Sequence, residues 1–273
     1  MEQKKDIVIE VKDLRKVYRL GSEKVVALNR VNVQIERGSI CCILGTSGSG
    51  KSTLLNMMAG LEKPTSGSVV IKSEHIEKMS EKKLALFRQK HIGFIFQSYN
   101  LLNALTALEN VSMPLVFRRV PRAKRNKIAL KYLAMVGLKE RYKHKPNQMS
   151  GGQQQRVGIA RAFVGAPEII FADEPTGNLD TKTSIEVMNI MWRMAREQNQ
   201  TIVIVTHDIE VSEYADTIVH IRDGDIQSVE YRDPQQIYEQ LIKPFETKET
   251  GAPAAGSVTK PETNTGESEN KEL

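Results

Sequence analysis

The feature that most constrains the fold is an apolar segment that runs directly into a glycine-rich loop, "SICCILGTSGSGKST". The loop fits the pattern G-x-x-x-x-G-K-[ST], in which glycines let the backbone wrap around phosphate with its N–H groups inward. In this pattern Lys51 reaches the β- and γ-phosphate oxygens and the Ser52 hydroxyl binds Mg²⁺. An apolar strand before the loop and a helix after it, "GKSTLLNMMAGL", give the required context. We therefore expect nucleotide binding by Gly45, Thr46, Ser47, Gly48, Ser49, Gly50, Lys51, Ser52 and Thr53.

Apolar strands and helical patterns alternate along the rest of the chain. The segments "GSVVIKS", "IGFIF", "EIIFAD" and "TIVIVTH" are short apolar strands. Such strands, alternating with helices, predict a mostly parallel sheet covered on both faces. We also expect strands near residues 6–12 and 30–36, a helix over about 181–198, and a hairpin that turns at Asp223-Gly224. Helical patterns dominate from about residue 105 to 164, which indicates an inserted helical subdomain.

Two carboxylates end one of these strands, in "IIFADEP". In open α/β sheets, ligand chemistry lies at the carboxyl ends of the strands. Asp173 would therefore hold the Mg²⁺ shell, while Glu174 would accept a proton from the attacking water or orient it. A carboxylate pair alone is usually solvated surface, but an apolar strand before it and a phosphate loop in the same chain favour catalysis.

A second segment, "MSGGQQQR", resembles half of a phosphate-binding site. Ser150, Gly151 and Gly152 open a helix, which offers free N–H groups and the positive end of the helix dipole. The segment has no lysine, whereas the complete phosphate loop lies a hundred residues earlier. The two segments therefore need not serve the same phosphate.

The segments "MSGGQQQRVGIARA" and "ADEPTGNLD" together resemble the ATP-binding cassette family, from about residue 7 to 230. The resemblance implies a P-loop NTPase, RecA-like fold with an antiparallel β subdomain beside the parallel core. It also implies that Ser150, Gly151, Gly152 and Gln153 contact the γ-phosphate held by a second copy in a head-to-tail ATP-sandwich dimer. Met149 stands where leucine is usual, and we expect little effect from this exchange of similar apolar residues.

Four other positions take roles from the same resemblance. Tyr18 would stack on adenine, with ordinary packing as the alternative, and Gln97 would bind Mg²⁺ and sense the membrane partner. Asp180 would couple the two sites across the dimer, and His207 would contact the γ-phosphate. A lone histidine after a strand is more often structural, but the accompanying motifs favour the catalytic interpretation. Gln97, Glu174 and His207 are thus the expected catalytic set, with ATP and Mg²⁺ as the ligands.

Within the family, "FIFQSYNLLNALTALENVSMPL" and "ADEPTGNLD" resemble the lipoprotein-release and macrolide-export group. This implies an ATPase subunit on the cytoplasmic face of the cell membrane, bound peripherally to an integral-membrane permease. The permease would export or extract an amphiphile, peptide or lipoprotein, or would transmit force. Two alternatives remain open: a soluble cassette ATPase acting on nucleic acid or in translation, and one serving cofactor assembly.

The domain boundaries follow from composition. We expect a nucleotide-binding domain over residues 1–242, with its helical subdomain at about 98–165, and a disordered acidic tail over 243–273. The tail is rich in Pro, Gly, Ser, Thr and Glu and cannot bury enough surface to offset its ordering entropy. The two cysteines, Cys41 and Cys42, lie in an apolar strand and are expected to be packing residues in a reducing compartment.

The chain carries a net charge of +6, and its densest basic run is "RRVPRAKRNK". The run is typical of a solvated helix face that begins near Pro121. A surface that faces lipid headgroups is the alternative interpretation. No aromatic residues interleave with the charges, so we expect no nucleic-acid partner.

Overall fold

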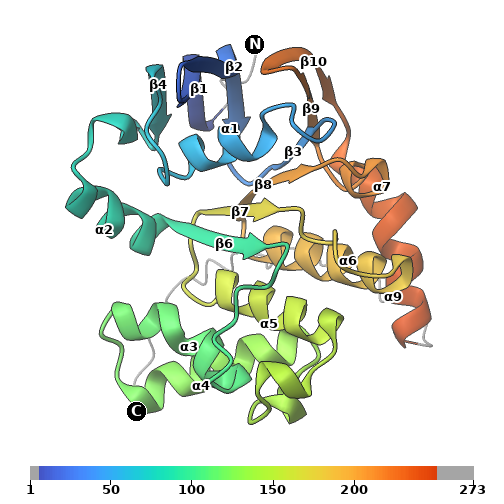
Figure 1. Ribbon diagram of the computed structural model, residues 1–273. Helices are drawn as coiled ribbons and strands as arrows, with labels where there is room; N and C mark the ends of the chain where they lie inside the picture. The colour runs from blue at the N-terminus through green and yellow to red at the C-terminus, as the bar shows by residue number, and fades with distance from the viewer. Residues whose placement is uncertain (1–5, 251–273) are drawn as a thin grey trace, which may run out of the picture.

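The computed structural model describes residues 6–250, in which two sheets lie above a block of helices (Figure 1). The main sheet has the strand order β10-β9-β3-β8-β7-β6, and all neighbours are parallel except the β9–β10 hairpin. Its strands are β3 (Ile40–Leu44), β6 (Ile92–Phe96), β7 (Ile169–Asp173), β8 (Thr201–Thr206), β9 (Thr217–Arg222) and β10 (Asp225–Tyr231). The expected parallel sheet and the hairpin turn at Asp223-Gly224 are confirmed.

Each face of the main sheet is covered by its own apolar core. One core includes α1 (Lys51–Met58) and residues of the second sheet, and the other includes α5 (Gly151–Phe163) and α6 (Thr181–Glu197). Successive residues of β3 alternate between the two cores: Cys41 belongs to the first core and Cys42 to the second. Both thiols are buried and free, and burial raises the pKa of Cys41 to about 12. The expectation that both cysteines are packing residues is confirmed.

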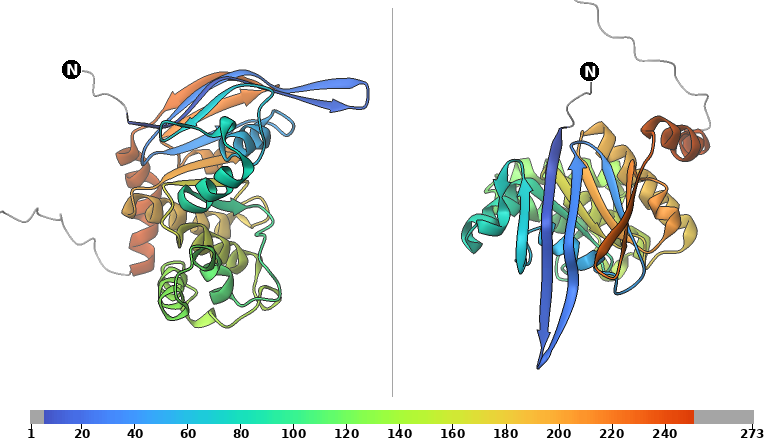
Figure 2. Two further views of the ribbon diagram at one scale, coloured as in Figure 1. Left: turned by 90° about the vertical axis from the view of Figure 1, so that its left-hand side faces the viewer. Right: turned by 90° about the horizontal axis from the view of Figure 1, so that it is seen from above.

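The second sheet is antiparallel, with the order β2-β1-β4-β5. Its strands are β1 (Ile7–Leu20), β2 (Glu23–Glu36), β4 (Ser66–Ile71) and β5 (Glu74–His75). The β1–β2 hairpin projects well beyond the rest of the molecule (Figure 2). Its strands are twice as long as expected, because register shifts such as the one between Val11 and Leu14 break the apolar alternation.

Between β6 and β7 the chain is helical, while the subdomain boundaries at about 98–165 stay a prediction. It contains α3 (Ala107–Phe117), α4 (Arg122–Met135), the short helices η2 (Lys139–Arg141) and η3 (Pro146–Gln148), and α5. Before β6 stand η1 (Ile76–Lys78) and α2 (Glu81–His91). The caps explain the helix starts: Thr106 forms a capping box with Glu109, and Ser80 accepts a hydrogen bond from the Lys83 N–H.

After β8 come α7 (Ile209–Ser212), α8 (Pro234–Ile237), a π-helical turn η4 (Tyr238–Ile242) and α9 (Lys243–Thr250). The expectation that disorder begins at Lys243 is therefore wrong for the first eight residues of that segment, which form α9. The rest of the expected acidic tail, residues 251–273, lies outside the described residues. None of the helices described between residues 6 and 250 is both long and apolar enough to cross a membrane.

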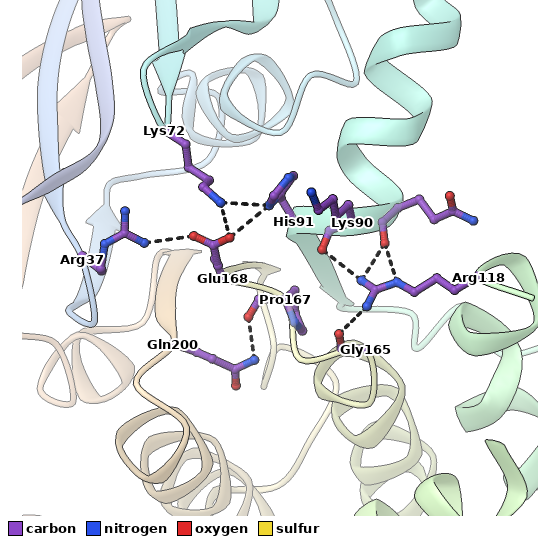
Figure 3. A network of polar contacts seen from close by, with 10 residues as sticks. Arg37, Lys72, Lys90, His91, Arg118, Gly165, Pro167, Glu168 and Gln200 are labelled. Atoms are coloured by element: carbon purple, nitrogen blue, oxygen red, sulfur yellow. Dashed lines mark hydrogen bonds and ion pairs between the residues drawn. The ribbon is translucent and has the colours of Figure 1, made fainter. Parts of the chain in front are cut away.

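Glu168, directly before β7, joins the two sheets and α2 at the end of the main sheet opposite the carboxyl ends of its parallel strands (Figure 3). Its carboxylate accepts a hydrogen bond from Arg37 at 2.9 Å, pairs with Lys72, and lies 3.1 Å from His91 Nδ1. Burial alone would raise the pKa of Glu168, but the bonds from Lys72, Arg37 and His91 outweigh it and lower the pKa to about 2. The ionised carboxylate therefore stabilises the folded state.

We expect Glu168→Gln to lower the free energy of unfolding at pH 7 by about 1–2 kcal/mol. The pKa shift alone would correspond to about 3 kcal/mol, but solvent screens this partly exposed group. Because the folded pKa is depressed, the difference between variant and wild type should be full above about pH 5 and shrink as the pH falls towards 2. Urea unfolding across this range measures it. Glu74→Gln, at an exposed position of β5, is the control, and an equal loss in both variants would contradict the role of Glu168.

Candidate active site

Four neighbouring parallel strands end at the same edge of the main sheet, and each is followed by residues expected at the site. The phosphate loop follows β3, Gln97 follows β6, Asp173 and Glu174 end β7, and His207 follows β8. Together they surround a cavity of about 480 Å³. The cavity is lined by Ala27, Ser47, Gly48, Gly50, Lys51, Ser52, Thr53, Gln97, Asp173, Glu174 and His207.

The phosphate loop takes a path that its glycines make possible. Gly48 and Gly50 have φ angles of 79° and 99°, in the left-handed region that favours glycine. A Cβ at Gly50 would lie 2.6 Å from the Ala27 carbonyl oxygen, so the close approach of β2 also excludes a side chain there. Lys51 begins α1, and its ammonium donates to the Thr46 carbonyl at 2.8 Å. Lys51 and the loop residues Ser47, Gly48 and Gly50 line the cavity, which places one cation and a glycine-rich backbone beside it, as phosphate binding requires.

The Ser52 hydroxyl lies 3.3 Å from Asp173 Oδ1, at the boundary between the phosphate loop and β7. Burial, followed by the nearby charge of Glu174, raises the pKa of Asp173, so a cation placed here would relieve both effects. A hydroxyl and one carboxylate, with phosphate oxygens completing the shell, are ligands that suit Mg²⁺. In the part of the chain that the structure describes, no three His, Cys, Asp or Glu side chains gather as a metal site of their own. This ligand set therefore fits a cation that arrives with a phosphate ligand.

Glu174 is held rigidly at the mouth of the cavity. Its φ of 44° is a left-handed conformation that costs a residue with a side chain about 1–2 kcal/mol. Its backbone N–H donates to the Val205 carbonyl at 2.9 Å, and its two carboxylate oxygens lie 2.9 Å from Thr206 Oγ1 and from His207 Nδ1. The carboxylate is thus fixed at its two oxygens while one side faces the cavity, which is the geometry of a positioned general base.

The "MSGGQ" segment, residues 149–153, which we call the signature, does not line this cavity. Ser150 caps α5: its hydroxyl accepts from the Gln153 N–H at 3.3 Å, and Gln153 Oε1 accepts from the Ser150 N–H at 3.1 Å. Gly152 packs against α6, since a Cβ there would lie 2.4 Å from the Thr183 methyl carbon. Asp180 caps α6 through the Thr183 N–H and hydroxyl, at 3.0 and 2.7 Å. The signature residues and Asp180 thus lie side by side, apart from their own chain's phosphate loop.

A family model described as "ABC transporter" matches residues 28–177, which contain the phosphate loop, the signature and the carboxylate pair. The chain belongs to the ABC transporter family. An uncharacterised ABC transporter ATP-binding protein of Thermotoga maritima is 49% identical over 225 residues, covering 82% of this chain and 96% of that protein. The macrolide export ATP-binding/permease protein MacB of Vibrio parahaemolyticus is 44% identical over 221 residues, which cover 81% of this chain but 34% of that longer protein.

Solved ABC cassettes share the fold. The dimeric structure of the cassette MJ0796, a protein of Methanocaldococcus jannaschii, matches with a TM-score of 0.77 and 44% identity, covering 82% of this chain and 99% of that one. A second dimeric structure of MJ0796, in a post-hydrolysis state with ADP and Pi, matches equally well at 43% identity. The expected P-loop NTPase fold is confirmed, and this ABC protein is an ATP-binding subunit with ATPase activity.

Tyr18 lies on β1, close to Thr53 at the end of the phosphate loop of this ABC protein. Its hydroxyl donates to Glu62 Oε2 at 2.7 Å, and the Lys16 ammonium lies 5.1 Å from the centre of its ring. Burial and then the bond to Glu62 raise the pKa of Tyr18, while the Thr53 hydroxyl acts in the opposite sense. The ring therefore lies next to the end of the phosphate loop without lining the phosphate cavity, and adenine stacking stays a prediction.

The structure adds residues that sequence reasoning missed. Thr206 orients Glu174, Ala27 brings β2 against the phosphate loop, and Asn178 holds Gln97 by donating to its carbonyl oxygen at 2.9 Å. Thr206 could have been suspected because it directly precedes His207. Nothing local distinguishes Ala27, since its role comes from the way the antiparallel sheet meets the main sheet.

Proposed function

We propose that this ABC subunit drives an integral-membrane permease by hydrolysing ATP in a head-to-tail pair of identical chains. The observation that carries the proposal is the separation of two phosphate-binding elements. The phosphate loop, Lys51 and Glu174 line one cavity, whereas Ser150 caps α5 and does not line it. A site that uses both elements needs two chains, and the dimeric MJ0796 structures support that arrangement.

In this site each side chain has one task. The loop N–H groups and the Lys51 ammonium neutralise the transferred phosphate, and the partner's Ser150, Gly151 and Gly152 close it from the other side. Glu174 orients the attacking water and takes its proton as the oxygen bonds to the γ-phosphorus, while ADP leaves. Mg²⁺, held by Ser52, Asp173 and Gln97, would offset the phosphate charge.

His207 and Asp180 complete the composite site in our proposal. His207 Nδ1 pairs with Glu174, so the opposite ring nitrogen is available to the γ-phosphate. Asp180 lies beside the signature of its own chain, where it can transmit the state of one site to the other. Gln97 lines the cavity and directly precedes the helical subdomain in the chain, and we propose that it connects the two.

A groove between α2 and α3 supports the proposed permease partner. It has a volume of about 530 Å³ and is mostly apolar, and Leu86 and Phe117 on its walls are 58% and 66% exposed. Arg118, directly after α3, links α3 to α2, because its guanidinium donates to the carbonyls of Gln89 and Lys90 on α2 and of Gly165 (Figure 3). A rigid apolar groove of this size suits a short amphipathic helix.

The relatives suggest where such a helix would come from. In MacB of Vibrio parahaemolyticus the matching segment is about a third of a protein named both ATP-binding and permease. We infer that the groove receives a cytoplasmic helix of a separate permease subunit, which places this chain peripherally on the cytoplasmic face of the cell membrane. The permease would export or extract an amphiphile, peptide or lipoprotein, or would transmit force without moving a substrate.

We expect Phe117→Glu to abolish recovery of the permease with the chain while leaving its basal ATPase activity within about twofold of wild type. Docking of the permease helix would bury the new carboxylate in an apolar groove without a partner, which is energetically unfavourable. Affinity purification from detergent-solubilised membranes, with mass spectrometry, measures the recovery of the protein encoded next to this gene. Tyr231→Glu, on β10, adds the same charge at an aromatic residue of nearly equal exposure and should retain the permease. Recovery of RNA or of a soluble scaffold in place of a membrane protein would support the soluble alternatives.

A further inference from the structure

The charge of this chain is concentrated in its helical subdomain. Residues 98–165 contain thirteen Lys and Arg but only two acidic residues, Glu109 and Glu140, so this segment has a net charge of +11. The net charge of the whole chain is +6. The remainder of the chain carries −5. ATP binding does not explain this distribution, because Arg156 and Arg161 are the only two of these thirteen that lie on the signature helix α5.

The charges gather on one face of α4. Lys124, Lys127 and Lys131 are exposed and follow a helical spacing, while Ala129 and Leu133 on the opposite face are buried against the subdomain. Exposed Arg119 and Arg122 stand at the start of the helix, and exposed Lys139 follows its end. We call these six residues the basic face; the helix they follow is about 20 Å long.

The basic face has little to balance it within the chain. Among residues 6–250, no carboxylate forms an ion pair with any of its six members. Glu109 senses one member of the face: its pKa is lowered mainly by hydrogen bonds from Thr106 and further by the charge of Arg122. The cations at the start of α4 also oppose the helix dipole, so they do not serve the stability of the helix.

We infer that the basic face binds the anionic headgroups of the membrane to which the permease would bring this subunit. The inference rests on the proposed function only for that proximity. The face begins at Arg119, two residues after Phe117 of the groove, so a chain docked through the groove holds the start of α4 close to the bilayer. Each basic residue near an anionic lipid surface contributes about 1 kcal/mol to binding, so the face can act as a second, weak anchor beside the permease.

A nucleic acid fits the same face less well. Binding to single strands uses aromatic rings on which bases stack. The tyrosine of α4, Tyr132, points away from the basic face, because its hydroxyl donates to Gln198 Oε1 at 2.8 Å at the C-terminus of α6. Along α4 the face therefore offers charge without a stacking ring, which suits a headgroup layer.

The test is co-flotation of the purified chain with vesicles of phosphatidylcholine containing 30% phosphatidylglycerol, in 0.1 M salt. We expect wild type to float with these vesicles, to stay behind with pure phosphatidylcholine, and to be released at 0.5 M salt. The triple variant Lys124→Gln, Lys127→Gln, Lys131→Gln should bind about 100-fold more weakly, following the contribution of about 1 kcal/mol per residue. Its ATPase activity should match wild type, which shows that the fold is intact.

The matched control removes the same charge elsewhere: Lys24→Gln, Lys63→Gln, Lys78→Gln, at exposed positions of the antiparallel subdomain and its loops. This control should bind vesicles within about twofold of wild type. Absence of wild-type binding, or equal weakening in both triple variants, would overturn the inference. So would tighter binding of the basic face to a single-stranded RNA than to the vesicles. Because the assay needs no permease, a negative result would not affect the proposed ATPase activity or the proposed permease partner.

Discussion

Glu174→Gln is expected to reduce steady-state ATP hydrolysis by at least about 100-fold while ATP still binds. The amide keeps the shape of the side chain and can still contact Thr206, but it cannot take the proton of the attacking water. With turnover blocked, the ATP-bound pair of chains should persist. Phosphate release measures turnover, and gel filtration with ATP measures the dimer.

Glu210→Gln is the control for that result. Glu210 is exposed on α7 and lines a neighbouring cavity that does not contain the phosphate loop, so its loss should change hydrolysis by less than about threefold. If Glu174→Gln also stayed within threefold of wild type, Glu174 could not be the base. The contact between Glu174 and His207 would then serve only to hold the end of β7.

Ser150→Arg should abolish hydrolysis and yet leave nucleotide affinity of the monomer within about twofold of wild type. The bulky cation occupies the place of the partner's γ-phosphate, whereas the chain's own loop is untouched because Ser150 does not line that cavity. Lys51→Ala should behave oppositely and lower ATP affinity by about tenfold or more, through loss of a charged contact with phosphate. Calorimetry at concentrations where the protein is monomeric measures both affinities.

Ser80→Arg controls for the structural part of Ser150→Arg. Both serines cap a helix, and each hydroxyl accepts a backbone N–H, so both variants lose a cap worth about 1 kcal/mol. Only Ser150→Arg should lose ATPase activity. If the affinity of its monomer fell as far as that of Lys51→Ala, the signature would serve its own chain's phosphate, and the head-to-tail pair would be wrong.

The nucleotide cavity could be predicted from the sequence because each of its parts ends a strand. The phosphate loop, the carboxylate pair and His207 each follow a short apolar run, and parallel strands bring their carboxyl ends to one edge. The positions of these residues within one cavity confirm that reasoning. The link between the signature and a second chain came from resemblance, since no pattern in one chain specifies its partner.

The features that could not be predicted depend on contacts between distant segments. Strand β1 continues to Leu20 because it pairs with β2 through several register shifts, which hide the alternation. Helix α9 occupies a segment whose composition suggests disorder; there, a cation–π contact between Arg193 of α6 and the Phe245 ring helps to hold the helix in place. Glu168 likewise contacts Arg37, Lys72 and His91, which are distant in the sequence, and no local pattern connects them.

The alternation of β3 between two cores has a practical consequence. Cys41 and Cys42 are the only two thiols of the chain, and both are buried, one on each side of the central sheet. Burial raises the pKa of each, so at neutral pH neither forms the thiolate that alkylating reagents attack. The wild-type chain is thus ready for site-specific labelling, because a single cysteine introduced at the surface would carry a spectroscopic probe without background.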